Sequence, residues 1–204
     1  MTESTAQPWF TRWQKIARRI RVPLGFVAAG LYLWELYGHR PQIGPMLWSL
    51  ALVLPGCWLR SYAAGYVKKN QELTVTGPYA HTRNPLYLGS MLMAAGFAVA
   101  LMSVAFATVL VAGFTVIYVP VIASEEAFLR RTFGNFELYC KQVPRLIPRV
   151  TPGNMPGAEV GEMETGRFSF ARYRKHREYN SAIGAALLYG SLWLAIALHS
   201  MLGK

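Results

Sequence analysis

Long apolar segments alternate with short polar segments along most of this chain. Residues 22–38 and 43–66 are predominantly apolar, and residues 86–123 contain no charged side chain. A helix needs about 20 apolar residues to cross a bilayer. The third run is too long for one crossing, so we predict two helices in a tight hairpin that turns near Met102–Ser103. Another apolar run, 181–202, predicts a fifth crossing.

These runs predict an all-α fold, a polytopic membrane helix bundle of about five transmembrane helices whose cytoplasmic loops form the binding site. We expect three regions: 1–66 with the first two helices, a core over 67–150, and 151–204 with the last helix. Within the third region, residues 151–166 are rich in Pro and Gly, which is typical of a mobile linker. The sequence RFSFARYRKHREY then mixes aromatic and cationic side chains, as interfacial segments do.

The charge pattern predicts the orientation of these helices. The chain carries 21 Lys and Arg against 10 acidic residues, a net charge of +11. Basic residues gather before the first apolar run, after the second, and between the fourth and fifth. The opposite side has only Arg40 between the first two runs. The positive-inside rule therefore places the N-terminus, the loop 67–85 and the segment 124–180 in the cytoplasm. The same basic excess favours anionic lipid, and not nucleic acid, as a partner.

Several classes of site are disfavoured by the residues present. The chain contains no Asp, so Asp-based triads and Asp-rich cation sites are absent. Cys57 and Cys140 lack metal-ligand spacing, and the four histidines form no pair at i, i+4, so we predict no metal. No Gly-x-Gly occurs, which argues against a Rossmann-type nucleotide site.

The stretch GPYAHTRNPLYLG, residues 77–89, is the first candidate for chemistry. Asn84-Pro85 reads as a helix N-cap followed by proline at the first helical position. The positive end of that helix, together with Arg83, favours a carboxylate or another anionic group. The alternative is an interfacial loop with an aromatic belt and a phosphate-facing arginine.

The second candidate is Glu125-Glu126, at the end of the fourth predicted span. Adjacent helical residues point about 100° apart, so at least one of these carboxylates can face the bundle interior. The alternative is a solvated charge pair answered by Arg130. The sequence predicts that the fourth helix extends to a break at Gly134, and that a short amphipathic helix then ends at Pro144. With both candidates on one side, we expect a pocket suited to a zwitterionic or cationic cofactor.

GPYAHTRNPLYLG, followed by EEAFLRRTFGNFELYCKQVPRLIP, resembles the isoprenylcysteine carboxyl methyltransferase family over residues 67–148. These integral-membrane methyltransferases are similar to the phosphatidylethanolamine methyltransferases. The resemblance implies S-adenosylmethionine bound on the cytoplasmic side and a lipophilic acceptor that comes from the bilayer. By position, it implies that the cofactor is bound by Gln71, Glu72, Leu73, Thr74, Tyr79, Asn84, Pro85, Leu86, Tyr87 and Glu125.

We assign the catalytic roles to Arg83 and Glu126. Glu126 is the candidate base for an acceptor that requires deprotonation. For an acceptor that is already nucleophilic, positioning and exclusion of water supply most of the effect.

The sequence departs from the family pattern at several positions. Asn84 replaces the usual histidine, and Phe136 and Cys140 flank a single tyrosine, Tyr139. The eukaryotic enzymes carry an arginine for the substrate carboxylate where this chain has Val121. The resemblance therefore argues against a prenylcysteine carboxylate and favours a neutral, amine or thiol head group.

Two other functions are considered. One is a membrane reductase of the sterol-reductase type that uses NADPH, which the short N-terminal half disfavours. The other is a non-enzymatic membrane accessory protein, in which the tyrosines and glutamates of the loops would be replaceable.

Overall fold

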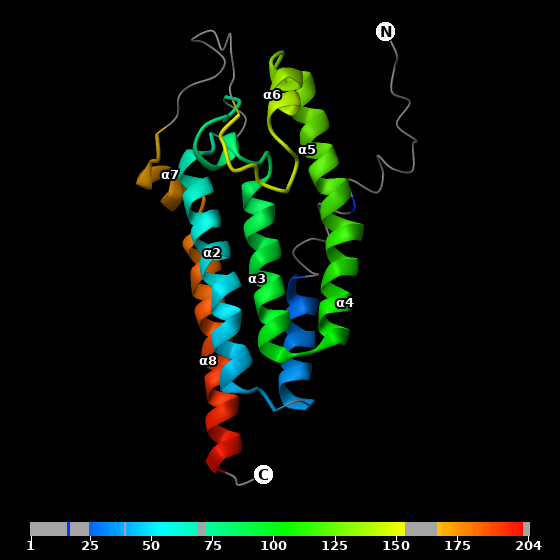
Figure 1. Ribbon diagram of the computed structural model, residues 1–204, viewed down its shortest axis with the longest axis vertical. Coiled ribbons are helices and arrows are strands. Elements are labelled where there is room, and N and C mark those ends of the chain that lie inside the picture. Colours follow the sequence, from blue (N-terminus) through cyan, green and yellow to red (C-terminus); the bar gives the residue numbers. More distant parts are fainter. Residues whose placement is uncertain (1–15, 17–24, 39, 69–71, 154–166, 202–204) are drawn as a thin grey trace.

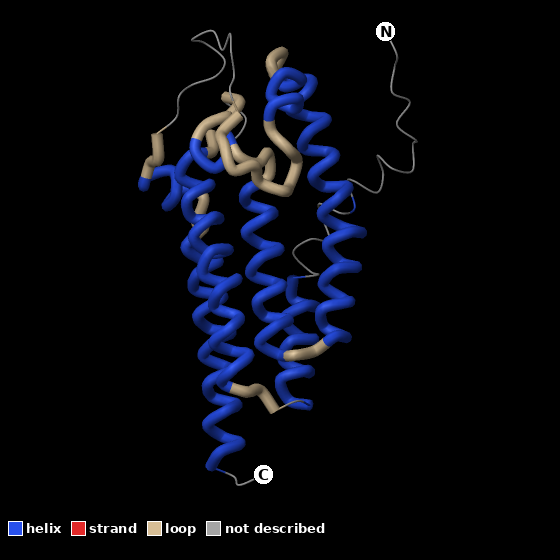
Figure 2. Tube along the Cα trace, viewed as in Figure 1, coloured by secondary structure: helices blue, strands red, loops and turns tan. Residues whose placement is uncertain are grey.

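The computed structural model describes residues 16, 25–38, 40–68, 72–153 and 167–201. Throughout these residues every regular element is a helix, and Figure 2 shows no strand. The all-α prediction is therefore confirmed for the part of the chain that the structure describes.

Long helices run alongside one another, and the shorter elements gather at one end of the bundle (Figure 1). After a helical stretch over 25–38, the elements follow in the order α2 (Ile43–Tyr66), η1 (Gly77–Ala80), α3 (Pro85–Leu101), α4 (Val104–Gly113), η2 (Phe114–Tyr118), α5 (Val119–Thr132), α6 (Phe136–Gln142), α7 (Phe170–Lys175) and α8 (Tyr179–Met201). The elements η1, α6 and α7 share the end of the bundle where α3 begins.

Three helices among the described residues are long and apolar enough to cross a membrane: Ile43–Tyr66, Val104–Thr132 and Tyr179–Met201. Pro85–Leu101 is also apolar but shorter. Of the first predicted span, residues 25–38 are helical and 22–24 lie outside the described residues. The number of five crossings stays a prediction.

The predicted hairpin turns where the sequence placed it. Met102 closes α3 in the left-handed conformation, with φ of 51°. The Ser103 side chain then caps α4 by accepting a hydrogen bond of 3.1 Å from the backbone N–H of Phe106. A capping serine that follows a left-handed residue ends one helix and starts the next within two residues.

Helices α2 and α3 pack closely because glycines face each other. A Cβ atom built on Gly56 would lie 2.8 Å from the carbonyl oxygen of Gly89, and one on Gly96 would lie 3.0 Å from that of Ser49. Small residues let two apolar helices approach until their backbones touch. Elsewhere, α8 is joined to α2 by a 2.5 Å hydrogen bond between the hydroxyls of Ser49 and Tyr189.

The helix Val104–Thr132 is continuous, with a π-helical turn, η2, between α4 and α5. Such turns insert an extra residue and are frequent at functional sites. The helix ends at Thr132, close to Gly134, and α6 ends at Gln142, shortly before Pro144. The predicted extension, break and short helix are confirmed.

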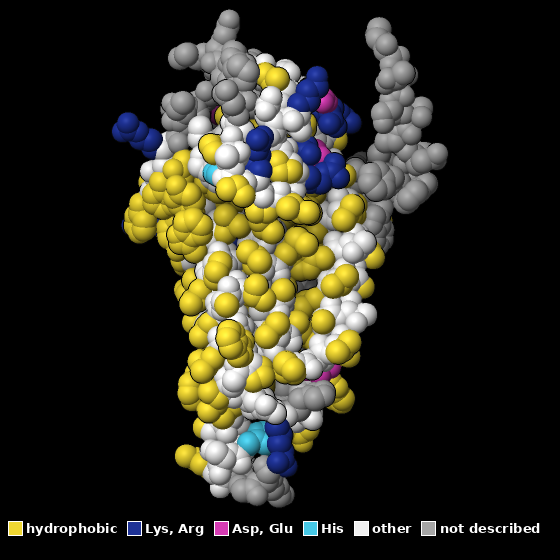
Figure 3. Space-filling view, in the orientation of Figure 1, with side chains coloured by type: hydrophobic (Ala, Val, Ile, Leu, Met, Phe, Trp, Pro, Cys, Tyr) yellow, Lys and Arg dark blue, Asp and Glu magenta, His cyan; other side chains and the backbone are white. Residues whose placement is uncertain are grey.

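Apolar side chains cover the middle of the bundle on the face shown in Figure 3, and Lys and Arg gather around α5 and α6 at one end. This distribution is typical of a protein that spans a bilayer with charged residues at the surface.

Candidate functional site

The loop after α2 is held by backbone hydrogen bonds to a segment far along the chain. Gly77 begins the loop's 3-10 turn with φ of +59°, a conformation that favours glycine. The N–H of Arg83 donates to the carbonyl of Pro144 at 2.9 Å, and the N–H of Arg149 donates to that of His81 at 3.0 Å. Residues 77–84 are therefore positioned by the segment that follows α6.

Asn84 is the N-cap of α3 and Pro85 is its first residue, as predicted. The Asn84 side chain does not cap the helix, however, because its Nδ2 donates to the carbonyl of Arg145 at 3.0 Å. Thr82 donates to the same carbonyl at 3.2 Å. The amide that replaces the family's histidine thus binds the start of α3 to the segment after α6.

Glu126 is buried between two arginines. Its carboxylate lies 3.1 Å from Nη1 of Arg83 and 2.6 Å from Nη2 of Arg145. The prediction that one of the paired glutamates faces the interior is confirmed. In the alternative interpretation Arg130 answers the glutamates, but its guanidinium pairs with Glu137 on α6. The break after α5 turns α6 back so that Glu137 is within reach.

Arg83 has a second partner in Cys140. Its Nη1 donates to Sγ of Cys140 at 2.8 Å. Burial raises the pKa of Cys140, against an opposing effect of the Arg83 charge. A raised pKa keeps the sulfur in the neutral thiol form, so Glu126 remains the anion that balances Arg83.

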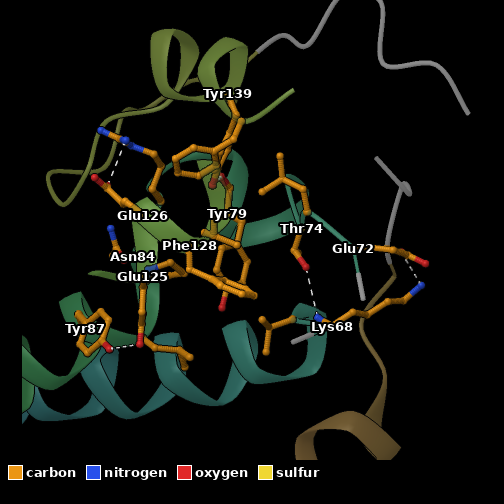
Figure 4. Close-up of a pocket in the computed structure, with 17 residues that line it drawn as sticks. Lys68, Glu72, Thr74, Tyr79, Asn84, Tyr87, Glu125, Glu126, Phe128 and Tyr139 are labelled. Atoms are coloured by element: carbon orange, nitrogen blue, oxygen red, sulfur yellow. Dashed lines mark hydrogen bonds and ion pairs between the residues drawn. The ribbon is translucent and has the colours of Figure 1, made fainter. Parts of the chain in front are cut away.

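Glu125 points to the other side of α5. Its Oε1 accepts a 2.8 Å hydrogen bond from the hydroxyl of Tyr87, as Figure 4 shows. The ring of Tyr87 packs edge-on against Tyr118 of the π turn, with centroids 5.3 Å apart. Val121 is fully buried in the same cluster, beside Ile117. The surroundings of Glu125 and Tyr87 are therefore aromatic and aliphatic.

Two buried tyrosines form the opposite wall. The hydroxyl of Tyr139 donates to the carbonyl of Tyr79 at 2.7 Å. Burial raises the pKa of both phenols, and the negative charge of Glu125 raises that of Tyr79 further. Both side chains are therefore neutral hydrogen-bonding groups. Leu73 and Val75 pack beneath α6 and complete this wall.

These elements enclose a pocket with a volume of about 400 Å³. Volumes of roughly 300–1,000 Å³ are typical of small-molecule sites. The pocket is lined by Val67, Lys68, Glu72, Leu73, Thr74, Tyr79, Arg83, Asn84, Pro85, Leu86, Tyr87, Glu125, Glu126, Phe128, Leu129, Phe136 and Tyr139. Every residue that we predicted for the site lines it except Gln71, which lies outside the described residues.

Several lining residues were not predicted. Lys68 makes two contacts with the loop before η1. Its ammonium group forms an ion pair of 3.0 Å with Glu72, and its backbone N–H donates to Thr74 Oγ1 at 3.3 Å. Arg145 does not line the pocket but pairs with Glu126, and it was also not predicted. A sequence signal existed for Lys68, which lies four positions before Glu72, whereas Arg145 has no glutamate within seven positions.

Comparison with known proteins identifies a family match that covers most of the pocket. The sequence model of the family described as phospholipid methyltransferase matches residues 47–136. This segment contains every lining residue of the pocket except Tyr139. No solved structure matches the chain.

Two curated proteins are similar. The cobalt-zinc-cadmium resistance protein CzcN of Cupriavidus metallidurans is 31% identical over 141 residues, which is 64% of this chain and 62% of that protein. The nickel-cobalt-cadmium resistance protein NccN of Alcaligenes xylosoxydans xylosoxydans is 34% identical over 94 residues, 46% of this chain and 43% of that protein. The chain therefore spans about half of the length of these relatives.

The family match coincides with the motifs that indicated membrane methyltransferases and with the pocket that they line. Over residues 47–136, the chain is similar to the phospholipid methyltransferase family.

Proposed function

We propose that this protein transfers a methyl group from S-adenosylmethionine to a lipophilic acceptor at the membrane surface. The observation that carries the proposal is the pocket that residues 72–87 and α5 enclose. It lies at the charged end of an apolar helix bundle. The similarity of residues 47–136 to a methyltransferase family supports the reaction class. The type of donor and acceptor is our inference from the lining residues.

The lining chemistry fits the donor. Glu72 and Glu125 bring carboxylates that offset a sulfonium charge or bind amino and ribose groups, and Phe128 and Tyr79 offer apolar faces to a base. The first turn of α3, with Arg83 beside it, favours the donor's carboxylate. When bound, S-adenosylmethionine supplies an activated methyl group. The chain's own residues orient it and exclude water.

The acceptor side is apolar. Tyr87, which lines the pocket, packs in an apolar cluster with Tyr118 and the buried Val121. A cation that would pair with a carboxylate is absent at residue 121. This supports an acceptor with an apolar tail and a neutral, amine or thiol head group. A water-soluble acceptor would gain nothing from a site bounded by this surface.

The test is calorimetry on the full-length protein in detergent with four ligands: S-adenosylmethionine, its demethylated product, NADPH and a zinc or cadmium salt. We expect binding of the first two. The metal arm is included because the two relatives are named for metal resistance. Binding of NADPH but not of S-adenosylmethionine would support the reductase alternative. Metal binding without donor binding would replace the methyltransferase proposal.

Labelled S-adenosylmethionine offered with membrane lipid extract, and separately with soluble metabolites, identifies the acceptor class. We expect label in the organic phase with the lipid extract. Label only in the aqueous fraction contradicts a lipophilic acceptor. Label on a prenylcysteine carboxylate contradicts the head-group inference and leaves the methyltransferase assignment in place.

We further propose that the pocket faces the cytoplasm and that anionic lipid binds the basic surface around it. The charge asymmetry of the sequence supports this orientation. Reporter fusions after residues 42, 75, 160 and 204 are expected to report outside, inside, inside and outside. A cytoplasmic signal at residue 204 contradicts the five-crossing topology.

A further inference from the structure

Arg60 is the sole charged residue in the apolar run 43–66. A cation within a membrane segment is costly unless it is paired, so its partners carry information. The Arg60 guanidinium binds groups from two other helices. Its Nη2 lies 2.7 Å from Oε2 of Glu178, and its Nε donates to Ser181 Oγ at 3.0 Å, at the start of α8. Both Arg60 and Glu178 are mostly buried.

The same guanidinium also reaches the first turns of α3. Its Nη1 donates to the carbonyl oxygen of Leu86 at 3.2 Å and to the hydroxyl of Ser90. Ser90 in turn donates to the Leu86 carbonyl at 3.0 Å. Arg60 therefore connects Glu178, in the turn before α8, with the backbone of α3 through its one planar group.

The fit of Arg60 against α3 depends on Gly89. A Cβ atom at Gly89 would lie 2.7 Å from Cγ of Arg60. The missing side chain leaves room for the arginine stem to pass α3 and reach the Leu86 carbonyl. The contact is thus built into the packing of the two helices.

The contacts from Glu178 through Arg60 lead to Leu86, at the candidate pocket. Leu86 lines the pocket, and Tyr79 on the facing wall is close enough to be affected by both charges of the pair. Glu178 raises the pKa of Tyr79, and Arg60 lowers it, although burial is the larger cause. The C-terminal segment also binds the end of α2, because Nε of Arg172 donates to the Gly65 carbonyl at 2.8 Å.

We propose that the start of the C-terminal helix supports the pocket from outside its lining, and that Glu178, acting through Arg60, is a positioning residue that holds the first turn of α3 at the pocket wall. Glu178 lies well outside the segment 47–136 that matches the family. The proposal rests on the proposed function insofar as it assigns the pocket to the methyl donor. Its structural part, the coupling of α8 to residues 86–90, is independent of the ligand.

The test compares Glu178→Gln with Tyr189→Phe in the full-length protein. Tyr189 also joins α8 to α2, through its 2.5 Å bond with Ser49, and it does not line the pocket. Tyr189→Phe is therefore a matched control for a lost α8–α2 contact. The readouts are hydrogen exchange of the peptide 83–93, affinity for S-adenosylmethionine, and the midpoint of thermal unfolding.

For Glu178→Gln we expect exchange in this peptide to be faster by about tenfold and donor affinity to fall by about tenfold, the ratio that 1.4 kcal/mol gives. For Tyr189→Phe we expect wild-type values of both at a comparable unfolding midpoint. Glu178→Asp, which keeps the charge, is expected to recover most of the affinity. If Glu178→Gln does not fold, Ser181→Ala, which removes the bond from Nε of Arg60 to α8, takes its place with the same readouts.

Unchanged exchange in the Glu178 variant, or equal effects in both variants, overturns the inference whatever the donor result. A wild-type protein that binds no donor contradicts the proposed function, and the exchange comparison then still decides whether α8 positions α3. Faster exchange with unchanged donor affinity overturns the link to the pocket.

Discussion

Glu126→Gln is expected to lower the free energy of unfolding by about 3–5 kcal/mol, the cost of breaking a buried ion pair by removing one partner. The glutamine is nearly isosteric, but it leaves the buried Arg83 guanidinium without its anion. Arg83 is 13% exposed and Glu126 is 5% exposed at their side chains, so water cannot replace the lost charge. Chemical denaturation in detergent, followed by tryptophan fluorescence, measures the change.

The matched control is Glu137→Gln, which breaks the ion pair with Arg130 at a solvent-exposed position. Exposed pairs contribute about 0–1 kcal/mol, so this variant should unfold nearly like the wild type. A Glu126→Gln protein with wild-type stability but no methyl transfer would contradict the structural role. It would instead support the hypothesis that Glu126 is the catalytic base.

Glu125→Lys is expected to weaken binding of S-adenosylmethionine by about 100-fold or more. The carboxylate is the acceptor for the Tyr87 hydroxyl and lines the pocket. Replacing it by an ammonium group turns attraction for a cationic donor into repulsion, and each such term is worth about 4 kcal/mol at 4 Å when the effective dielectric constant is 20. Calorimetry with the donor and with its neutral-sulfur product measures the loss.

Two comparisons make this result specific. Glu137→Lys adds the same charge change outside the pocket and should leave donor affinity within a factor of about two, because screening by salt acts over about 10 Å. Tyr87→Phe removes one hydrogen bond and should weaken binding by about 1–3 kcal/mol. The product, which lacks the sulfonium charge, should lose less affinity in Glu125→Lys than the donor does. Equal losses for both ligands would argue against a carboxylate–sulfonium interaction.

The helices of this protein were predictable because apolar runs and helix-capping residues are local signals. The hairpin at Met102–Ser103, the start of α3 at Pro85 and the break near Gly134 all depend on residues within a few positions of the feature. The inward direction of one glutamate also followed from helix geometry. The convergence of both motifs on one pocket was expected from their placement on the same predicted side.

The partners within the site were not predictable in this way, because they depend on how distant segments pack. The alternative interpretation paired Arg130 with the glutamates at the end of the fourth span, but the turn before α6 brings Glu137 within its reach. Arg145 reaches Glu126 only because the segment after α6 folds back beneath α3. Arg60 could have been identified as important from its isolation in an apolar run, whereas its bond to Glu178, more than a hundred residues away, could not.

The glycine contacts between α2 and α3 influence which helices of the bundle can move. With backbone against backbone at Gly56 and Gly89, these two helices have little room to shift against each other, so we expect them to move together. The helix Val104–Thr132 carries the π turn and the Tyr118 ring that packs against Tyr87. We therefore expect an acceptor of the proposed kind, with an apolar tail, to displace this helix and not the α2–α3 pair when it reaches Tyr87.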